Sequence, residues 1–129
     1  MTVELIFVGT ELLLGSIVNT NGAYLAEKCA ALGLASYFQT VVGDNEERLS
    51  QTLRTALGRS DVVILSGGLG PTEDDLTKET AAKVCGKALV MHEPTKAAIE
   101  KFFKDRGLEP TKNNWKQAMV PQGAQVLDN

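Results

Sequence analysis

The chain has 129 residues, a formal net charge of −3 and a sequence pI of about 5.1, which suits one domain that folds without disulfides or a structural metal. The acidic balance and the single tryptophan, Trp115, give no basic or aromatic footprint, so we expect no nucleic-acid partner. The N-terminus does not read as a signal peptide and no stretch reaches membrane-spanning length, so we expect a cytoplasmic protein with no membrane partner.

The first third of the chain predicts a strand, a loop and a helix. Residues 3–8 form a nearly continuous apolar run, as in a strand covered on both faces. After the glycine-flanked stretch 9–15, the polar cluster 19–22 can cap a helix that ends at Gly33. The apolar face of this helix is expected to comprise Leu25, Cys29 and Leu32.

A second strand and helix follow. Residues 35–42 predict the strand, and Asp44 lies where its carboxyl end is expected, as a site residue or as a helix cap. Glu46 and Glu47 open a helix with an apolar stripe of Leu49, Leu53 and Leu57.

A third strand, over residues 61–65, leads into the glycine-rich acidic loop 66–77. Its glycines, Gly67, Gly68 and Gly70, permit positive φ angles and close approach of a phosphate to the main-chain amides. Glu73, Asp74 and Asp75 would repel a bare phosphate, and Mg²⁺ held by carboxylates and phosphate oxygens together would resolve that conflict. In the alternative interpretation, the glycines only form the turn and the acids only complement the dipole of the next helix.

That next helix, over residues 76–84, is expected to turn Leu76, Ala81, Val84 and Cys85 inward. Cys29 and Cys85 form no CxxC pair, so we expect both to be buried, reduced core residues.

The last third predicts smaller elements. A strand over residues 88–91 precedes a helix that starts near Pro94 and has an apolar face of Ile99, Phe102 and Phe103. His92 is expected to be a surface or capping residue. Residues 111–119 predict a short helix, in which Lys112 and Lys116 either face a second phosphate or belong to a solvated face. Residues 121–127 predict a final strand.

Alternating strands and helices predict an α/β fold with a largely parallel sheet and helices on both faces. Ligands of such sheets bind beyond the carboxyl ends of the strands. The loops around Glu11, Asp44 and Asp75 are therefore expected to converge there.

Four stretches together resemble the N-terminal domain of the CinA family, which is similar to the molybdopterin-binding fold of the MoaB, Mog and MoeA proteins. They are residues 9–15 with 19–21, then 41–45, 67–77 and 113–118. The resemblance implies a three-layer α/β/α domain with a mainly parallel sheet and a nucleotide-like or pterin-like ligand. It also implies divalent-metal-dependent hydrolysis of ADP-ribose, and a homo-oligomer. Leu69 stands where relatives often have threonine, which removes a hydroxyl from the phosphate loop.

In the CinA family, some members carry a separate C-terminal domain with nicotinamide mononucleotide deamidase activity, and nothing in these 129 residues corresponds to that domain. The glycine-rich stretch that the family places directly after position 129 is also missing. The resemblance therefore implies a single N-terminal domain that is truncated at its C-terminal end.

The resemblance assigns catalytic roles to Asp44 and Asp75, with Asp74 as a further ligand of Mg²⁺ or another divalent cation. In this hypothesis amides of the three loop glycines bind phosphate and Lys78 or Lys116 offsets its charge. The remaining expected ligand-binding residues are Glu11, Asn19, Asn21, Thr72 and Asn114. Two alternatives stay open: a non-catalytic molybdopterin- or nucleotide-binding module, and a role in assembly.

Overall fold

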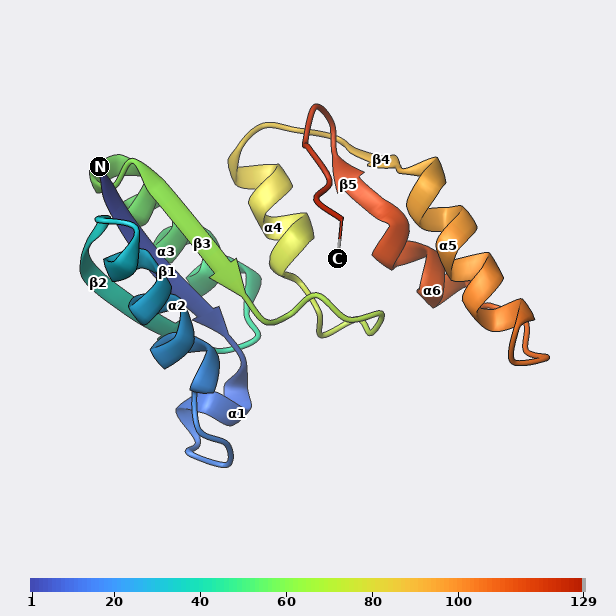
Figure 1. Cartoon of the computed structure of the whole chain (residues 1–129), viewed down its shortest axis with the longest axis horizontal. Helices are drawn as coiled ribbons and strands as arrows, with labels where there is room; N and C mark the ends of the chain where they lie inside the picture. The colour runs from blue at the N-terminus through green and yellow to red at the C-terminus, as the bar shows by residue number, and fades with distance from the viewer. Residues whose placement is uncertain (129) are drawn as a thin grey trace.

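The computed structural model describes residues 1–128 and has a three-stranded parallel sheet with helices on both faces, followed by a smaller group of elements at the C-terminal end (Figure 1). The elements, in chain order, are β1 (Thr2–Val8), α1 (Thr10–Leu13), α2 (Thr20–Ala31), β2 (Ala35–Val42), α3 (Glu46–Arg59), β3 (Val62–Ser66), α4 (Thr77–Val84), β4 (Leu89–Met91), α5 (Glu93–Lys104), α6 (Lys112–Trp115), the 3₁₀ helix η1 (Lys116–Ala118) and β5 (Met119–Pro121).

The sheet has the strand order β2-β1-β3, and both pairings are parallel. The central strand β1 is buried from Val3 to Val8, as its continuous apolar run predicts. Phe7 lies opposite Val41 on one side and Ser66 on the other, so the three strands end at one edge of the sheet. The predicted fold class is confirmed.

Two apolar clusters form the core, one on each face of the sheet. The first joins Ile6 and Val8 to Leu49, Leu53 and Ala56 of α3, with Ala81 and Val84 of α4 packed against it. The second joins Val3, Leu5 and Phe7 to Cys29 of α2. Alternate residues of β1 therefore point to opposite helical layers, which gives the three-layer arrangement.

Side-chain caps set the starts of three helices. The carbonyl oxygens of Asn19 and Asn45 accept hydrogen bonds from the third residue beyond each of them, at 3.0 Å in both cases. Asn45, not Asp44, therefore caps α3. His92 caps α5 by accepting from the N–H of Thr95, which confirms its predicted capping role.

Three residues predicted to be buried are exposed. Leu32 is 76% exposed because it follows the last turn of α2. Leu57 is 47% exposed because Ala56, three residues after Leu53, takes the buried position on α3. Cys85 follows the last residue of α4 and is also exposed, so only Cys29 is the buried thiol that the sequence predicts.

The C-terminal strands form a separate two-stranded antiparallel sheet. Leu89, Val90 and Met91 of β4 lie opposite Pro121, Val120 and Met119 of β5. The predicted final strand over residues 121–127 is wrong, because β5 ends at Pro121 and residues 122–128 form no strand. None of the helices within residues 1–128 combines the length and the apolar character that crossing a bilayer requires.

Candidate functional site

The loops that follow β1 and β2 are tied together at the carboxyl edge of the sheet. The N–H of Thr10 donates to the Asp44 carboxylate at 3.3 Å, and the N–H of Asp44 donates to the Thr10 hydroxyl at 3.1 Å. Asp44 therefore lies beside the start of α1, where its charge is favourable to the first exposed amides of that helix. This pair brings two of the three predicted loops together.

A cavity of about 150 Å³ lies between the loops that follow β1 and β3. Its polar lining includes Glu11, Asn19, Asn21 and Ser66, and the Asn21 amide donates to the Ser66 hydroxyl at 3.2 Å. Its apolar lining comprises Phe7, Val8, Leu12, Ile17 and Val18. The cavity is thus a polar pocket with apolar walls, at the edge where ligands of parallel sheets bind.

The glycines of the loop after β3 are required by packing within the protein. Gly67 and Gly68 have φ angles of 93° and 65°. A Cβ atom on Gly67 would lie 2.2 Å from the carbonyl oxygen of Val8, and one on Gly68 would lie 2.2 Å from the Thr77 hydroxyl. That hydroxyl donates to the Gly67 carbonyl at 2.7 Å, so the start of α4 is joined to the start of the loop. Gly67 itself lies against Val8 at the end of β1.

Asp75 is held inside its own turn. Its Oδ2 accepts from the Thr72 N–H at 3.0 Å and from the Thr72 hydroxyl at 2.6 Å. The hydrogen bond from the Thr72 hydroxyl lowers the pKa of Asp75 below its ordinary value of 3.8, against the opposing effect of partial burial. Gly70 is glycine because a Cβ atom there would lie 2.6 Å from this carboxylate.

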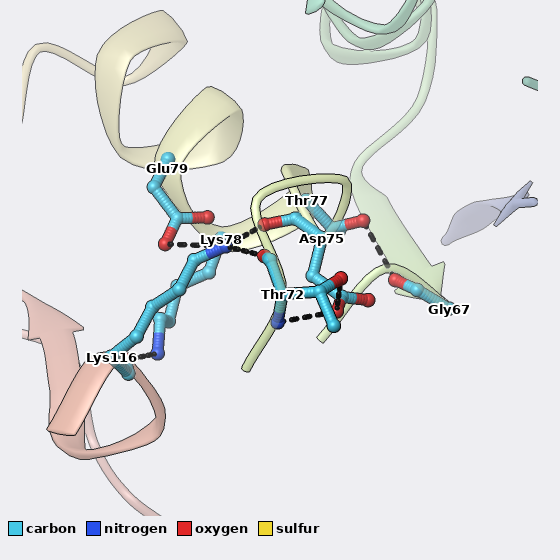
Figure 2. A network of polar contacts seen from close by, with 7 residues as sticks. All are labelled: Gly67, Thr72, Asp75, Thr77, Lys78, Glu79 and Lys116. Carbon is cyan, nitrogen blue, oxygen red and sulfur yellow. Dashed lines mark hydrogen bonds and ion pairs between the residues drawn. The ribbon is translucent and has the colours of Figure 1, made fainter. Parts of the chain in front are cut away.

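Lys78 and Lys116 donate to main-chain carbonyls of the protein (Figure 2). The Lys78 ammonium donates to the carbonyl of Lys116 at 2.5 Å, and the Lys116 ammonium donates to the carbonyl of Thr72 at 2.5 Å and to that of Asp75. Burial lowers the pKa of Lys78. One interpretation of the sequence placed Lys78 or Lys116 against a phosphate, whereas the structure places both between α4, the acidic turn and η1.

Asn114 lies apart from the cavity. Its side-chain oxygen accepts from the N–H and the hydroxyl of Thr111 at 2.7 and 2.9 Å, which stabilises the first turn of α6. It also lines an open groove of about 460 Å³ along α5, together with Ile99, Phe102 and Phe103. Phe102 is 51% exposed in this groove, so the predicted apolar face of α5 covers no closed core.

The expected magnesium ligands do not assemble into one site. Within residues 1–128 no group of three or more His, Cys, Asp or Glu side chains is placed to hold a metal ion. The Asp44 carboxylate accepts a hydrogen bond from Thr10 and the Asp75 carboxylate accepts two from Thr72, while Asp74 is exposed on the turn. The residues present therefore do not form the donor set that was predicted for Mg²⁺.

Several residues of this edge were not predicted. Ser66 completes the cavity at the last position of β3, and Thr10 and Thr77 fix the two loops beside it. A hydroxyl residue directly after a buried strand, or at the first position of a helix, is the only local signal that points to them.

The family model described as probable molybdopterin binding domain matches residues 4–127. A solved structure of the protein CinA from Thermoplasma acidophilum, described as having unknown function, superposes with a TM-score of 0.89 and 36% identity. The match covers 99% of this chain and 75% of that one. The chain belongs to the CinA family. Its domain is of the probable molybdopterin binding type.

Further similar proteins are consistent with this assignment to the CinA family. A proposed competence-damage inducible protein from Alkaliphilus oremlandii is 55% identical over the whole chain, which spans only 31% of that relative's length. The molybdopterin biosynthesis enzyme MoaB from Thermus thermophilus superposes with a TM-score of 0.63. At 16% identity, over 93% of this chain and 78% of that one, MoaB supports the shared fold alone.

Proposed function

We propose that this CinA-family chain binds a nucleotide-like or pterin-like ligand, with the heterocycle or ribose in the cavity between the loops after β1 and β3. The side chains that line the cavity favour the heterocycle or ribose of such a ligand over its phosphate groups. Within the described chain, no Lys, Arg or His side chain lines the cavity, and Glu11 brings a carboxylate to it. The Glu11 carboxylate would repel a phosphate there, whereas it can accept hydrogen bonds from ring N–H groups and ribose hydroxyls.

Each part of the lining has a function in this proposal. The Glu11 carboxylate accepts from N–H or hydroxyl groups, and the Asn21 amide both donates and accepts. The side chains of Leu12 and Ile17 provide the apolar surface against which a planar ring packs. Asn19 contributes less than expected from the sequence, because its side-chain oxygen already caps α2.

The size of the cavity limits what enters it. At about 150 Å³ it is smaller than the several hundred Å³ of a complete small-molecule site, so a nucleotide would fill it only in part. The phosphates would then continue along the loop that begins at Gly67. The observation that carries the proposal is therefore the pairing of a carboxylate and amides with apolar walls in one small cavity.

Binding is tested by calorimetry with AMP, ADP-ribose, a pterin phosphate and inorganic phosphate. We expect AMP, ADP-ribose or the pterin phosphate to bind, with affinity lowered about tenfold by Asn21→Ala, the loss of one well-placed hydrogen-bonding group. Asn113→Ala, an exposed asparagine on α6, is the matched control. Binding of inorganic phosphate alone, unaffected by Asn21→Ala, would reject the cavity as the ligand site.

The second candidate function is hydrolysis of a nucleotide diphosphate such as ADP-ribose. Asp75 favours it, because the N–H and hydroxyl of Thr72 hold its carboxylate in a fixed orientation in the turn that follows the loop glycines. Since the described side chains assemble no metal site, the expected Mg²⁺ would depend on substrate phosphates for most of its ligands. The test is incubation with ADP-ribose, with and without Mg²⁺, followed by detection of AMP.

Under the hydrolysis hypothesis, Asp75→Asn abolishes AMP release and Asp105→Asn, on the surface after α5, leaves it unchanged. Release of AMP at the original rate by Asp75→Asn would reject the catalytic role. The homo-oligomer expected from the resemblance stays a prediction, which light scattering at two protein concentrations would check.

A further inference from the structure

The ammonium group of Lys116 is surrounded by oxygen atoms of the protein itself. It donates to the main-chain carbonyls of Thr72 and Asp75, and it lies 3.8 Å from the Glu79 carboxylate. Two of its three N–H donors are thus used in hydrogen bonds to main-chain carbonyls, and the Glu79 carboxylate adds an ion pair at longer range. The Lys116 side chain is only 24% exposed, so it is not a solvated surface lysine.

A second lysine completes the link in the opposite direction. Lys78, on the first turn of α4, donates to the main-chain carbonyl of Lys116 at 2.5 Å. Its side chain thus holds the main chain of η1, while the side chain of Lys116 holds the main chain of the acidic turn (Figure 2). Lys78 connects α4 to η1, and Lys116 connects η1 to the acidic turn. The two lysines therefore join the turn, α4 and η1 as one unit.

The turn that Lys116 holds is the one that orients Asp75. The Thr72 carbonyl accepts from the Asp75 N–H at 3.2 Å as well as from Lys116. Figure 2 shows Lys116 approaching the turn from the side of its carbonyl oxygens, with the Asp75 carboxylate on the other side, against the N–H and hydroxyl of Thr72. Lys116 therefore fixes the main chain on which the Asp75 carboxylate depends.

We infer that Lys116 is a positioning residue for Asp75 and couples the acidic turn to the α6–η1 segment, instead of binding a ligand phosphate. The importance of this turn for a ligand rests on the proposed function. The hydrogen bonds of Lys78 and Lys116 are formed within the protein and need no ligand. Loosening of η1 would release the turn, and release of the turn would free the Asp75 carboxylate from Thr72.

Amide hydrogen exchange on the ligand-free chain tests the inference. Lys116→Met keeps an unbranched side chain but removes all three donors, so we expect the amides of Asp75 and Thr77 to exchange about tenfold faster or more. The amides of Leu5 and Ile6 in β1 report global stability and should keep their protection. Lys116→Arg keeps donors and charge and should restore most of the lost protection.

Lys112→Met is the matched control, because Lys112 lies four residues earlier in the same segment and is exposed. It removes the same charge and should leave exchange in the turn unchanged. If Lys116→Met unfolds the chain, Lys78→Met tests the link from the other side, and the same amides should lose protection. Unchanged exchange at Asp75 and Thr77 in the folded variant would overturn the inference.

Ligand binding separates this inference from the proposed function. Loss of protection in Lys116→Met together with no binding of ADP-ribose, AMP or a pterin phosphate by the unaltered chain rejects the proposed function and supports the link. Unchanged protection together with weaker ADP-ribose binding, which Lys116→Arg restores, makes Lys116 a ligand-binding residue and overturns the inference.

Discussion

The carboxylate of Asp75 accepts two hydrogen bonds from Thr72, from its N–H at 3.0 Å and from its hydroxyl at 2.6 Å. Both donors belong to the residue three positions earlier, so a short stretch of chain orients this carboxylate, and the pKa of Asp75 is lowered. Hydrogen bonds to the charged form of a carboxyl group favour ionisation. This relationship can be tested apart from any ligand.

Replacing the Thr72 hydroxyl should raise the pKa of Asp75 towards its ordinary value of 3.8. Thr72→Val has nearly the same shape and keeps the main-chain donor, so one of the two hydrogen bonds is lost. The Asp75 carboxyl titration followed by carbon NMR measures the change. Thr55→Val, which removes a hydroxyl from α3, should leave the Asp75 titration where it is.

Gly67 should tolerate no side chain. Gly67→Ala places a Cβ atom against the Val8 carbonyl at a φ angle of 93°, and we expect a loss of about 3 kcal/mol in the free energy of unfolding. Gly58→Ala, near the end of α3 and with no atom within 4 Å of the added Cβ, should stabilise the chain by about 0.5 kcal/mol. Urea unfolding compares the two. Equal stability of the two variants would contradict the tight contact at Gly67.

Glu4 should make the stability depend on pH. It is 1% exposed in the centre of β1, where the Arg59 guanidinium donates to both carboxylate oxygens at 2.7 and 3.0 Å. The hydrogen bond from Arg59 lowers the pKa of Glu4 below its ordinary value of 4.5. The stabilisation is therefore fully present above pH 4.5 and is lost as the pH falls through the lower pKa of the folded state.

Glu4→Gln should lower the free energy of unfolding by about 2 kcal/mol near neutral pH, because charge-assisted hydrogen bonds are replaced by neutral ones. The difference from the unaltered chain should shrink as the pH is lowered below 4.5, and urea unfolding at several pH values measures it. Glu27→Gln, on α2, is the control. A difference that stays constant to low pH would contradict the role of this ion pair.

Local signals predicted the parallel sheet well. The cap at Asn19 and the apolar run of β1 depend on neighbours within a few residues, and both predictions are confirmed. The pairing of β1 with β2 and β3 follows from the alternation of strands and helices. Glu4 was missed because its partner, Arg59, is 55 residues away.

The site was harder to predict for the same reason. The acceptors of Lys116 lie 41 and 44 residues earlier in the chain, so nothing in the local sequence distinguishes a lysine that holds a turn from one that faces a phosphate. The prediction of positive φ angles in the glycine-rich loop is correct for Gly67 and Gly68 but not for Gly70. That Gly67 and Gly68 exclude side chains from contact with Val8 and Thr77 is visible only once the strands are paired.

A nitrogen–proton NMR titration of the chain with ADP-ribose and with AMP tests the proposed ligand site most directly. We expect the largest chemical-shift changes at the main-chain amides of Ser66 and Gly67 and at the side-chain amide of Asn21, with little change along the α5 groove at Phe102. Shifts confined to the α5 groove, or no saturable shift with either compound or with a pterin phosphate, would contradict the assignment of the ligand site to the carboxyl edge of β1 and β3.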